Sequence, residues 1–163
     1  MSVDTTPATY TPGEKLAAAK LNTEVRDFAA GVQATWDIYV PTVTGTTNPS
    51  IGNGVLTGRY LRLGKTIICT IVMQMGSTTT YGSGTWTITL PVASVWASQT
   101  DVSMGSAHLF DTSATARKTG QVFNVGQSTV RIVTDSATLV GTAVPWTWAT
   151  GDVLSLDLVY EAN

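Results

Sequence analysis

Charged side chains and long apolar runs are both scarce in this sequence. Charged residues make up 12% of its 163 residues, about half the usual share, and the formal net charge is −2. Without a basic patch there is no electrostatic basis for binding nucleic acid or an anionic membrane. The longest apolar run falls far short of the roughly 20 residues that span a bilayer, and no apolar stretch follows Met1 as in a signal peptide. We therefore expect synthesis in a cytoplasm, and neither nucleic acid nor a membrane among the partners.

Histidine and cysteine occur once each, as His108 and Cys69. Zinc sites need several such ligands at set spacings, and a lone cysteine forms no internal disulfide. The acidic residues are scattered singly, and no nucleophile-elbow motif is present. The sequence thus predicts no catalytic residue, no metal site and no cofactor, and we expect a protein that is not an enzyme. We interpret His108 as a strand-surface residue and Cys69 as a small buried hydrophobe.

Threonine, by contrast, is abundant, with 29 copies in the chain. Its side chain is β-branched, favours strands and keeps a surface polar without adding charge. The composition therefore predicts a mainly β protein before any pattern is read.

The most regular pattern lies between Gly58 and Val92. In the segment 85–90, threonine alternates with Trp86, Ile88 and Leu90, which predicts a strand with one buried and one polar face. The run 67–75 is apolar almost throughout, which is typical of a strand covered on both sides. We interpret residues 58–66, 67–75 and 85–91 as three consecutive antiparallel strands, the first two joined by a tight turn at residues 64 and 65.

Residues 11–14 carry the signals of a helix start. Thr11 can cap a helix, Pro12 suits its first position and Glu14 completes a capping box, so we expect a helix from there to about Trp36. Its apolar residues fall at heptad spacing, and these are Leu21, Val25, Phe28 and Val32. Two interpretations stay open: the stripe packs on the chain's own sheet, or it drives self-association or docking on a larger assembly. Seven of the 20 charged residues lie between positions 14 and 37, which sets 1–36 apart as an N-terminal arm and helix.

The rest of the chain, residues 37–163, reads as short strands separated by turn clusters. We expect an edge strand at 38–41, a strand at 102–110, a hairpin formed by 121–125 and 128–133, and a last strand at 153–160. On that last strand Leu154, Leu156, Leu158 and Tyr160 share one face. About eight to ten antiparallel strands at this spacing predict a β-sandwich or a barrel.

Three aromatic residues are candidates for contact with a glycan or a partner protein. Trp146 and Trp148 are two positions apart and would share a strand face, and Tyr81 lies in a predicted turn. Aromatic rings offer a large contact area at low entropic cost. The alternative is that these rings fill a core or an interface between copies.

Several segments resemble small structural proteins of actinobacterial tailed phages. The helix segment is similar to the N-terminus of many minor tail proteins, and other segments are similar to the β domain often found with it. The helix matches are 10–16 (YTPGEKL) and 19–28 (AKLNTEVRDF), and the β matches are 57–60 (TGRY), 63–66 (LGKT), 82–85 (GSGT) with 90–92 (LPV), and 148–154 (WATGDVL). The Gly-Asp pair before the last strand also resembles trimeric jelly rolls of the C1q and tumour-necrosis-factor kind.

This resemblance implies a non-enzymatic virion component, either a minor tail protein or a capsid decoration protein. It implies a jelly-roll-like sandwich, displayed in several copies and in a trimer, with the helix attaching it to other virion proteins. No catalytic residue carries over from the family. A host cell-surface glycan remains an alternative partner for the β domain.

Overall fold

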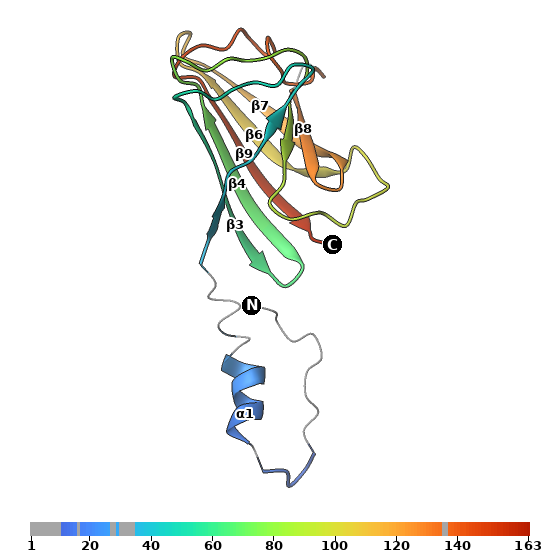
Figure 1. Cartoon of the computed structure of the whole chain (residues 1–163). Coiled ribbons are helices and arrows are strands. Elements are labelled where there is room, and N and C mark those ends of the chain that lie inside the picture. The colour runs from blue at the N-terminus through green and yellow to red at the C-terminus, as the bar shows by residue number, and fades with distance from the viewer. Residues whose placement is uncertain (1–10, 16, 27–28, 30–34, 135–136) are drawn as a thin grey trace.

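The computed structural model describes residues 11–15, 17–26, 29, 35–134 and 137–163. Within them, nine strands form one antiparallel sheet, preceded by a short helical segment (Figure 1). The helical elements are α1 (Ala18–Leu21) and the π-helical turn η1 (Asn22–Arg26). The strands are β1 (Asp37–Tyr39), β2 (Val43–Thr44), β3 (Val55–Leu63), β4 (Thr66–Gln74), β5 (Thr87–Thr89), β6 (Ser103–Asp111), β7 (Ala116–Gly126), β8 (Thr129–Thr134) and β9 (Val153–Glu161).

The order of the strands makes the sheet curl. It runs β1-β3-β4-β9-β6-β7-β8-β5-β2, so β1 and β2 form opposite edges although only residues 40–42 separate them. The two edges must therefore come close together. Thr42 N donates to Thr89 Oγ1 at 2.8 Å, and the Tyr39 hydroxyl of β1 lies 3.5 Å from Thr89 O of β5. The prediction of a mainly β fold with antiparallel strands is confirmed.

The core lies on the inner face of this curled sheet, and the opposite side is called the outer face below. Period-2 alternation sends every second side chain inward. On β4 the inner set is Ile67, Cys69, Ile71 and Met73, all buried. On β9 it is Leu154, Leu156, Leu158 and Tyr160, the set that the sequence placed on one face. Trp86, Ile88 and Leu90 are also buried, as expected.

The pairing of β5 corrects one expectation. β3 and β4 form the predicted hairpin at Gly64 and Lys65, but β5 does not add to β4. The free edge of β4 pairs with β9, and β5 pairs with β8 and β2. A period-2 pattern fixes which face a residue occupies, but it leaves the neighbouring strand undetermined.

The outer face of β4 corrects another expectation, because this strand is not covered on both sides. Ile68 and Val72 are half-exposed, and Val159 on the adjacent β9 is 60% exposed. Apolar residues therefore occupy both faces of β4, although only the inner face is packed. Elsewhere the predicted strand at 102–110, the hairpin of 121–125 with 128–133 and the edge position of β1 are confirmed.

The N-terminal helix begins later than expected, at Ala18 instead of near Pro12. Thr11 N donates to Glu14 Oε2 at 3.1 Å and Glu14 N donates to Thr11 O at 3.0 Å, which are contacts typical of a capping box. They close a turn rather than start a helix, because Gly13 has φ +83° and Ala17 is extended before α1 begins. Positive φ is incompatible with a right-handed helix. The later part of the predicted helix, residues 27–34, lies mostly outside the described part, and at its expected end Thr35 and Trp36 are not helical.

Candidate functional site

The predicted docking stripe is only partly visible in the structure. Val25 lies in η1 with 57% of its surface exposed. Leu21 ends α1, but its side chain is not among those described, and Phe28 and Val32 lie outside the described residues. The structure therefore supplies one exposed apolar side chain of this stripe and leaves the other three as predictions.

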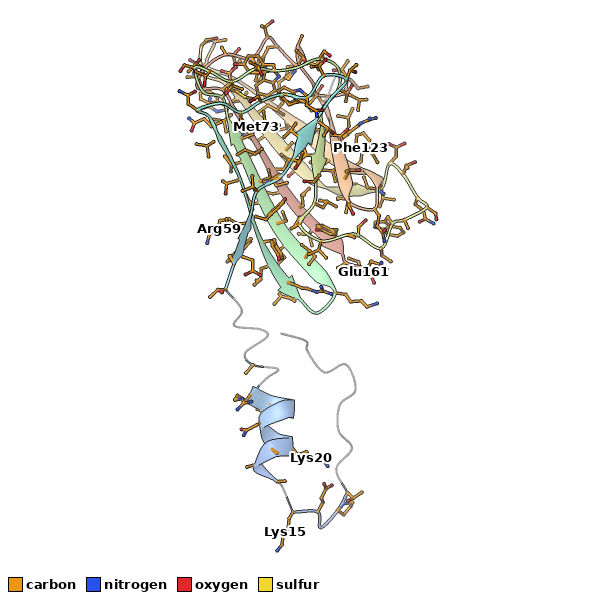
Figure 2. The ribbon with its side chains drawn as sticks, in the orientation of Figure 1. Lys15, Lys20, Arg59, Met73, Phe123 and Glu161 are labelled. Atoms are coloured by element: carbon orange, nitrogen blue, oxygen red, sulfur yellow. The ribbon has the colours of Figure 1, made fainter. Side chains whose placement is uncertain are left out.

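The segment carrying Val25 stands away from the sheet. Figure 1 shows α1 well separated from the strands, and Figure 2 shows Lys15 on the turn before it, also away from the sheet. Lys20 Nζ donates to Glu14 Oε1 at 2.6 Å, which ties α1 to the preceding turn. This bond to Lys20 and the backbone bond from Thr11 hold the pKa of the Glu14 carboxyl below its usual value. These contacts join residues of the same segment.

A second group of exposed apolar residues follows where the chain enters the sheet. Ile38 on β1 and Val40 just after it are 73% and 75% exposed, and Trp36 is also exposed. Tyr39, between them, turns inward and packs edge-on against Tyr60, with ring centroids 5.9 Å apart. Alternation along β1 thus leaves Ile38 and Val40 on the outer side of an edge strand. Exposed apolar side chains at an unpaired strand edge are typical of a surface that associates with another chain.

The aromatic residues singled out from the sequence belong to one cluster, in which Trp148 is buried whereas Trp146 and Tyr81 are partly exposed. Trp148 is 3% exposed, stacks on Trp86 with ring centroids 5.2 Å apart and donates its Nε1 hydrogen to Gly141 O at 2.8 Å. Trp148 is therefore a core residue rather than an exposed contact surface. Trp146 is half-exposed, and its ring centroid lies 5.7 Å from that of Trp148.

Tyr81 is also half-exposed and belongs to the same cluster through its backbone. Its carbonyl oxygen accepts bonds from Trp86 Nε1 and from the hydroxyl of Thr142, both at 3.1 Å. Partial burial and the nearby Asp152 carboxylate raise the pKa of the Tyr81 hydroxyl, because both disfavour the phenolate. Tyr81 and Trp146 thus remain the accessible rings of the predicted aromatic set.

Trp86 is the residue of this cluster that sequence reasoning did not connect with the others. It was assigned to the core by its alternation with threonine, but its stacking on Trp148 joins positions 62 residues apart. No local spacing signals a contact between segments so distant in the chain.

The two single-copy residues occupy different environments. Cys69 is buried on β4 with its Sγ 3.5 Å from the Tyr39 hydroxyl, and burial raises the pKa of its thiol above the usual value. A thiol in this state is a poor nucleophile. His108 is exposed on β6, paired in register with Thr119 and Ser155. The interpretations of Cys69 as a buried hydrophobe and of His108 as a strand-surface residue are both confirmed.

Within the described ranges, no three His, Cys, Asp or Glu side chains gather where they could share a metal ion. Among the same residues, no helix has the length and apolar character needed to cross a membrane. Comparisons of the chain with known protein families, with curated proteins and with solved structures find no match.

Proposed function

We propose that this protein is a non-enzymatic structural component of a tailed-phage particle, either a minor tail protein or a capsid decoration protein. Residues 1–36 attach it to other virion proteins, and the β domain of residues 37–163 faces outward. The resemblance of the helix segment and of four β segments to small phage structural proteins supports this proposal. In this view the protein is made in the cytoplasm of a host bacterium and resides in the virion. Its partners include neither nucleic acid nor a membrane.

One observation carries the proposal: apolar side chains are exposed on the N-terminal side of a domain that already has its own core. Val25, Ile38 and Val40 are each more than half exposed, whereas the sheet buries a continuous inner face without them. Exposing such side chains costs free energy, which association with another chain recovers. An attachment segment meets this description better than a helix that packs on its own sheet.

The proposal includes a homotrimer with a jelly-roll-like sandwich in each copy. The curl of the sheet supports the sandwich, since it brings the edge strands β1 and β2 together around one core. A cyclic trimer needs only one interface repeated by rotation, and the exposed edge of β1 is suited to contribute to it.

Deleting residues 1–36 and measuring incorporation into phage particles tests the attachment role. We expect the truncated chain to be absent from purified particles although it is made and folded. A finer variant replaces Ile38 and Val40 by threonine, which keeps the β-branched shape and removes the apolar surface. The matched control is Val159→Thr on the outer face of β9. Unchanged incorporation of the truncated chain would refute attachment through this segment.

The second candidate function is binding of a glycan or a host receptor by the β domain. It is favoured by the rings of Tyr81 and Trp146, which pack against the core but keep part of their surface exposed. A glycan array probed with the β domain and with its Tyr81→Ala variant checks this role. Binding that is lost in the variant supports it, and an array without hits removes it.

A further inference from the structure

A polar hollow of about 400 Å³ lies on the outer face where β2, β5 and β8 meet. Its lining consists of a single charged residue, one glycine and four threonines, namely Arg131, Gly45, Thr44, Thr46, Thr85 and Thr87. Thr44 pairs with Thr87 in the register of β2 and β5, and Arg131 reaches Thr87 from β8. The alternation that buries Trp86 and Ile88 therefore presents threonine hydroxyls to this hollow.

Arg131 is held in place but keeps most of its hydrogen-bonding capacity. Its Nε donates to Thr87 Oγ1 at 3.1 Å, which fixes the plane of the guanidinium group. No described residue accepts a bond from its two terminal nitrogens, and no described carboxylate forms an ion pair with it. A guanidinium presents these nitrogens as a planar fork that matches the two oxygens of a carboxylate. The hollow thus offers one positioned binding group for one anion.

The threonine hydroxyls around Arg131 are also free to bind. Thr46 and Thr85 make no side-chain hydrogen bond to any described residue. Thr87 Oγ1 accepts from Arg131, which leaves its own proton to donate. Thr44 alone is engaged as a donor, to Thr87 O at 3.4 Å. Hydroxyls of this kind both donate to and accept from the hydroxyls of a sugar.

Phe123 of β7 lies beside Arg131 on the side away from β5 and does not line the hollow. Phe123 of β7 is the direct register partner of Arg131, so the two side chains lie on the same face of the sheet. Phe123 is half-exposed and is labelled in Figure 2.

We propose that this hollow binds an acidic sugar, a saccharide unit that carries a carboxylate. The carboxylate pairs with the terminal nitrogens of Arg131, and the sugar hydroxyls bond to Thr46, Thr85 and Thr87. A single arginine in a chain of net charge −2 suits a ligand with one negative charge and not a polyanion. The inference concerns the β surface alone and does not depend on the protein's place in a phage particle.

Titration of the full ¹⁵N-labelled chain with methyl glucuronide, methyl glucoside, acetate and inorganic phosphate tests this. We expect the glucuronide to shift the amide signals around residues 85–87 and 131, and the neutral glucoside to bind roughly tenfold more weakly. Acetate and phosphate should bind more weakly than the glucuronide, since neither carries a sugar ring whose hydroxyls contact the threonines while a carboxylate pairs with Arg131. Equal binding of glucuronide and glucoside, phosphate binding as tight as glucuronide binding, or no shift at all would overturn the proposal.

Variants measure the contributions of the arginine charge and of the threonine hydroxyls to binding separately. Arg131→Gln should weaken glucuronide binding by roughly tenfold, and Arg131→Lys should recover only part of it because the fork is lost. Thr85→Val removes one hydroxyl without changing charge and should weaken the glucuronide and the glucoside alike. Arg59→Gln on β3 is the matched control, an exposed arginine elsewhere on the sheet (Figure 2). Circular dichroism checks that each variant is folded, and loss of binding in the Arg59 variant would contradict the assignment.

Discussion

Leu156 lies at the centre of the sheet and shows what a single buried side chain contributes. It has no exposed surface and pairs in register with Ile71 on β4 and Ala107 on β6. Truncating a leucine in such a position removes its transfer free energy and leaves a cavity among its neighbours.

We expect Leu156→Ala to lower the free energy of unfolding by about 2–5 kcal/mol. Val159→Ala on the same strand should change it by no more than about 0.5 kcal/mol, because Val159 points to solvent. Urea denaturation followed by tryptophan fluorescence measures both. Similar losses in the two variants would mean that the two faces of β9 are packed alike, against the burial seen here.

Asp111 makes the stability of the folded protein depend on pH. Its Oδ1 accepts bonds from Ala114 N at 2.9 Å and from Ser113 Oγ at 2.7 Å, and these bonds lower the pKa of the carboxyl. A lowered pKa in the folded state stabilises the fold above the ordinary aspartate value of about 3.9. That contribution is lost as the pH falls through the folded-state pKa.

The stability difference between wild type and Asp111→Asn should therefore be largest near neutral pH and shrink as the pH falls below 4. Chemical denaturation across this pH range measures the difference. An NMR titration of the Asp111 carboxyl carbon measures the pKa directly. A midpoint at or above the ordinary value would contradict the role assigned to the two bonds.

At the scale of elements, the close approach of β6 and β9 requires a glycine at position 105. The register of β6 is irregular between Ser103 and Gly105, and Gly105 lies opposite Leu158 of β9. A Cβ at Gly105 would overlap the backbone carbonyl oxygen of Asp157. Because a backbone atom cannot rotate away, the two strands would have to separate.

Gly105→Ala should destabilise the fold by about 1–3 kcal/mol and speed hydrogen exchange of the β6 and β9 amides. Gly126→Ala is the control, since its added Cβ would meet only Thr129 Oγ1, at an ordinary 3.5 Å. Thermal unfolding and exchange mass spectrometry follow both variants. Equal behaviour of the two alanines would show that β6 and β9 can adjust to the extra atom.

At the scale of the whole molecule, the core formed by the described residues lies among the strands and their loops. The buried core residues all lie between positions 43 and 162, and β1 begins at Asp37. The described residues of the N-terminal segment bury no large apolar side chain against this core. This distribution of the described core agrees with the proposal that the N-terminal segment serves attachment and not folding.

Removing residues 1–36 should leave the midpoint of thermal unfolding of the monomeric domain nearly unchanged and lower the mass of any assembly that the segment holds together. Calorimetry and light scattering of the full and truncated chains measure the two quantities. A truncated chain that fails to fold would place part of the core in the first 36 residues. If the number of copies in the assembly does not change, the self-association surface lies on the β domain.

The sequence by itself determined which residues face inward, because period-2 alternation along a strand is a local property. It identified the inner faces of β5 and β9, the hairpins β3–β4 and β7–β8, and the surface position of His108. It did not determine that β5 pairs with β8 and β2, that Gly13 ends a turn before α1, or that Trp148 stacks on Trp86. Those outcomes depend on contacts between segments far apart in the chain. The tertiary structure alone therefore decided that Arg131 and four threonines from separate segments line one hollow.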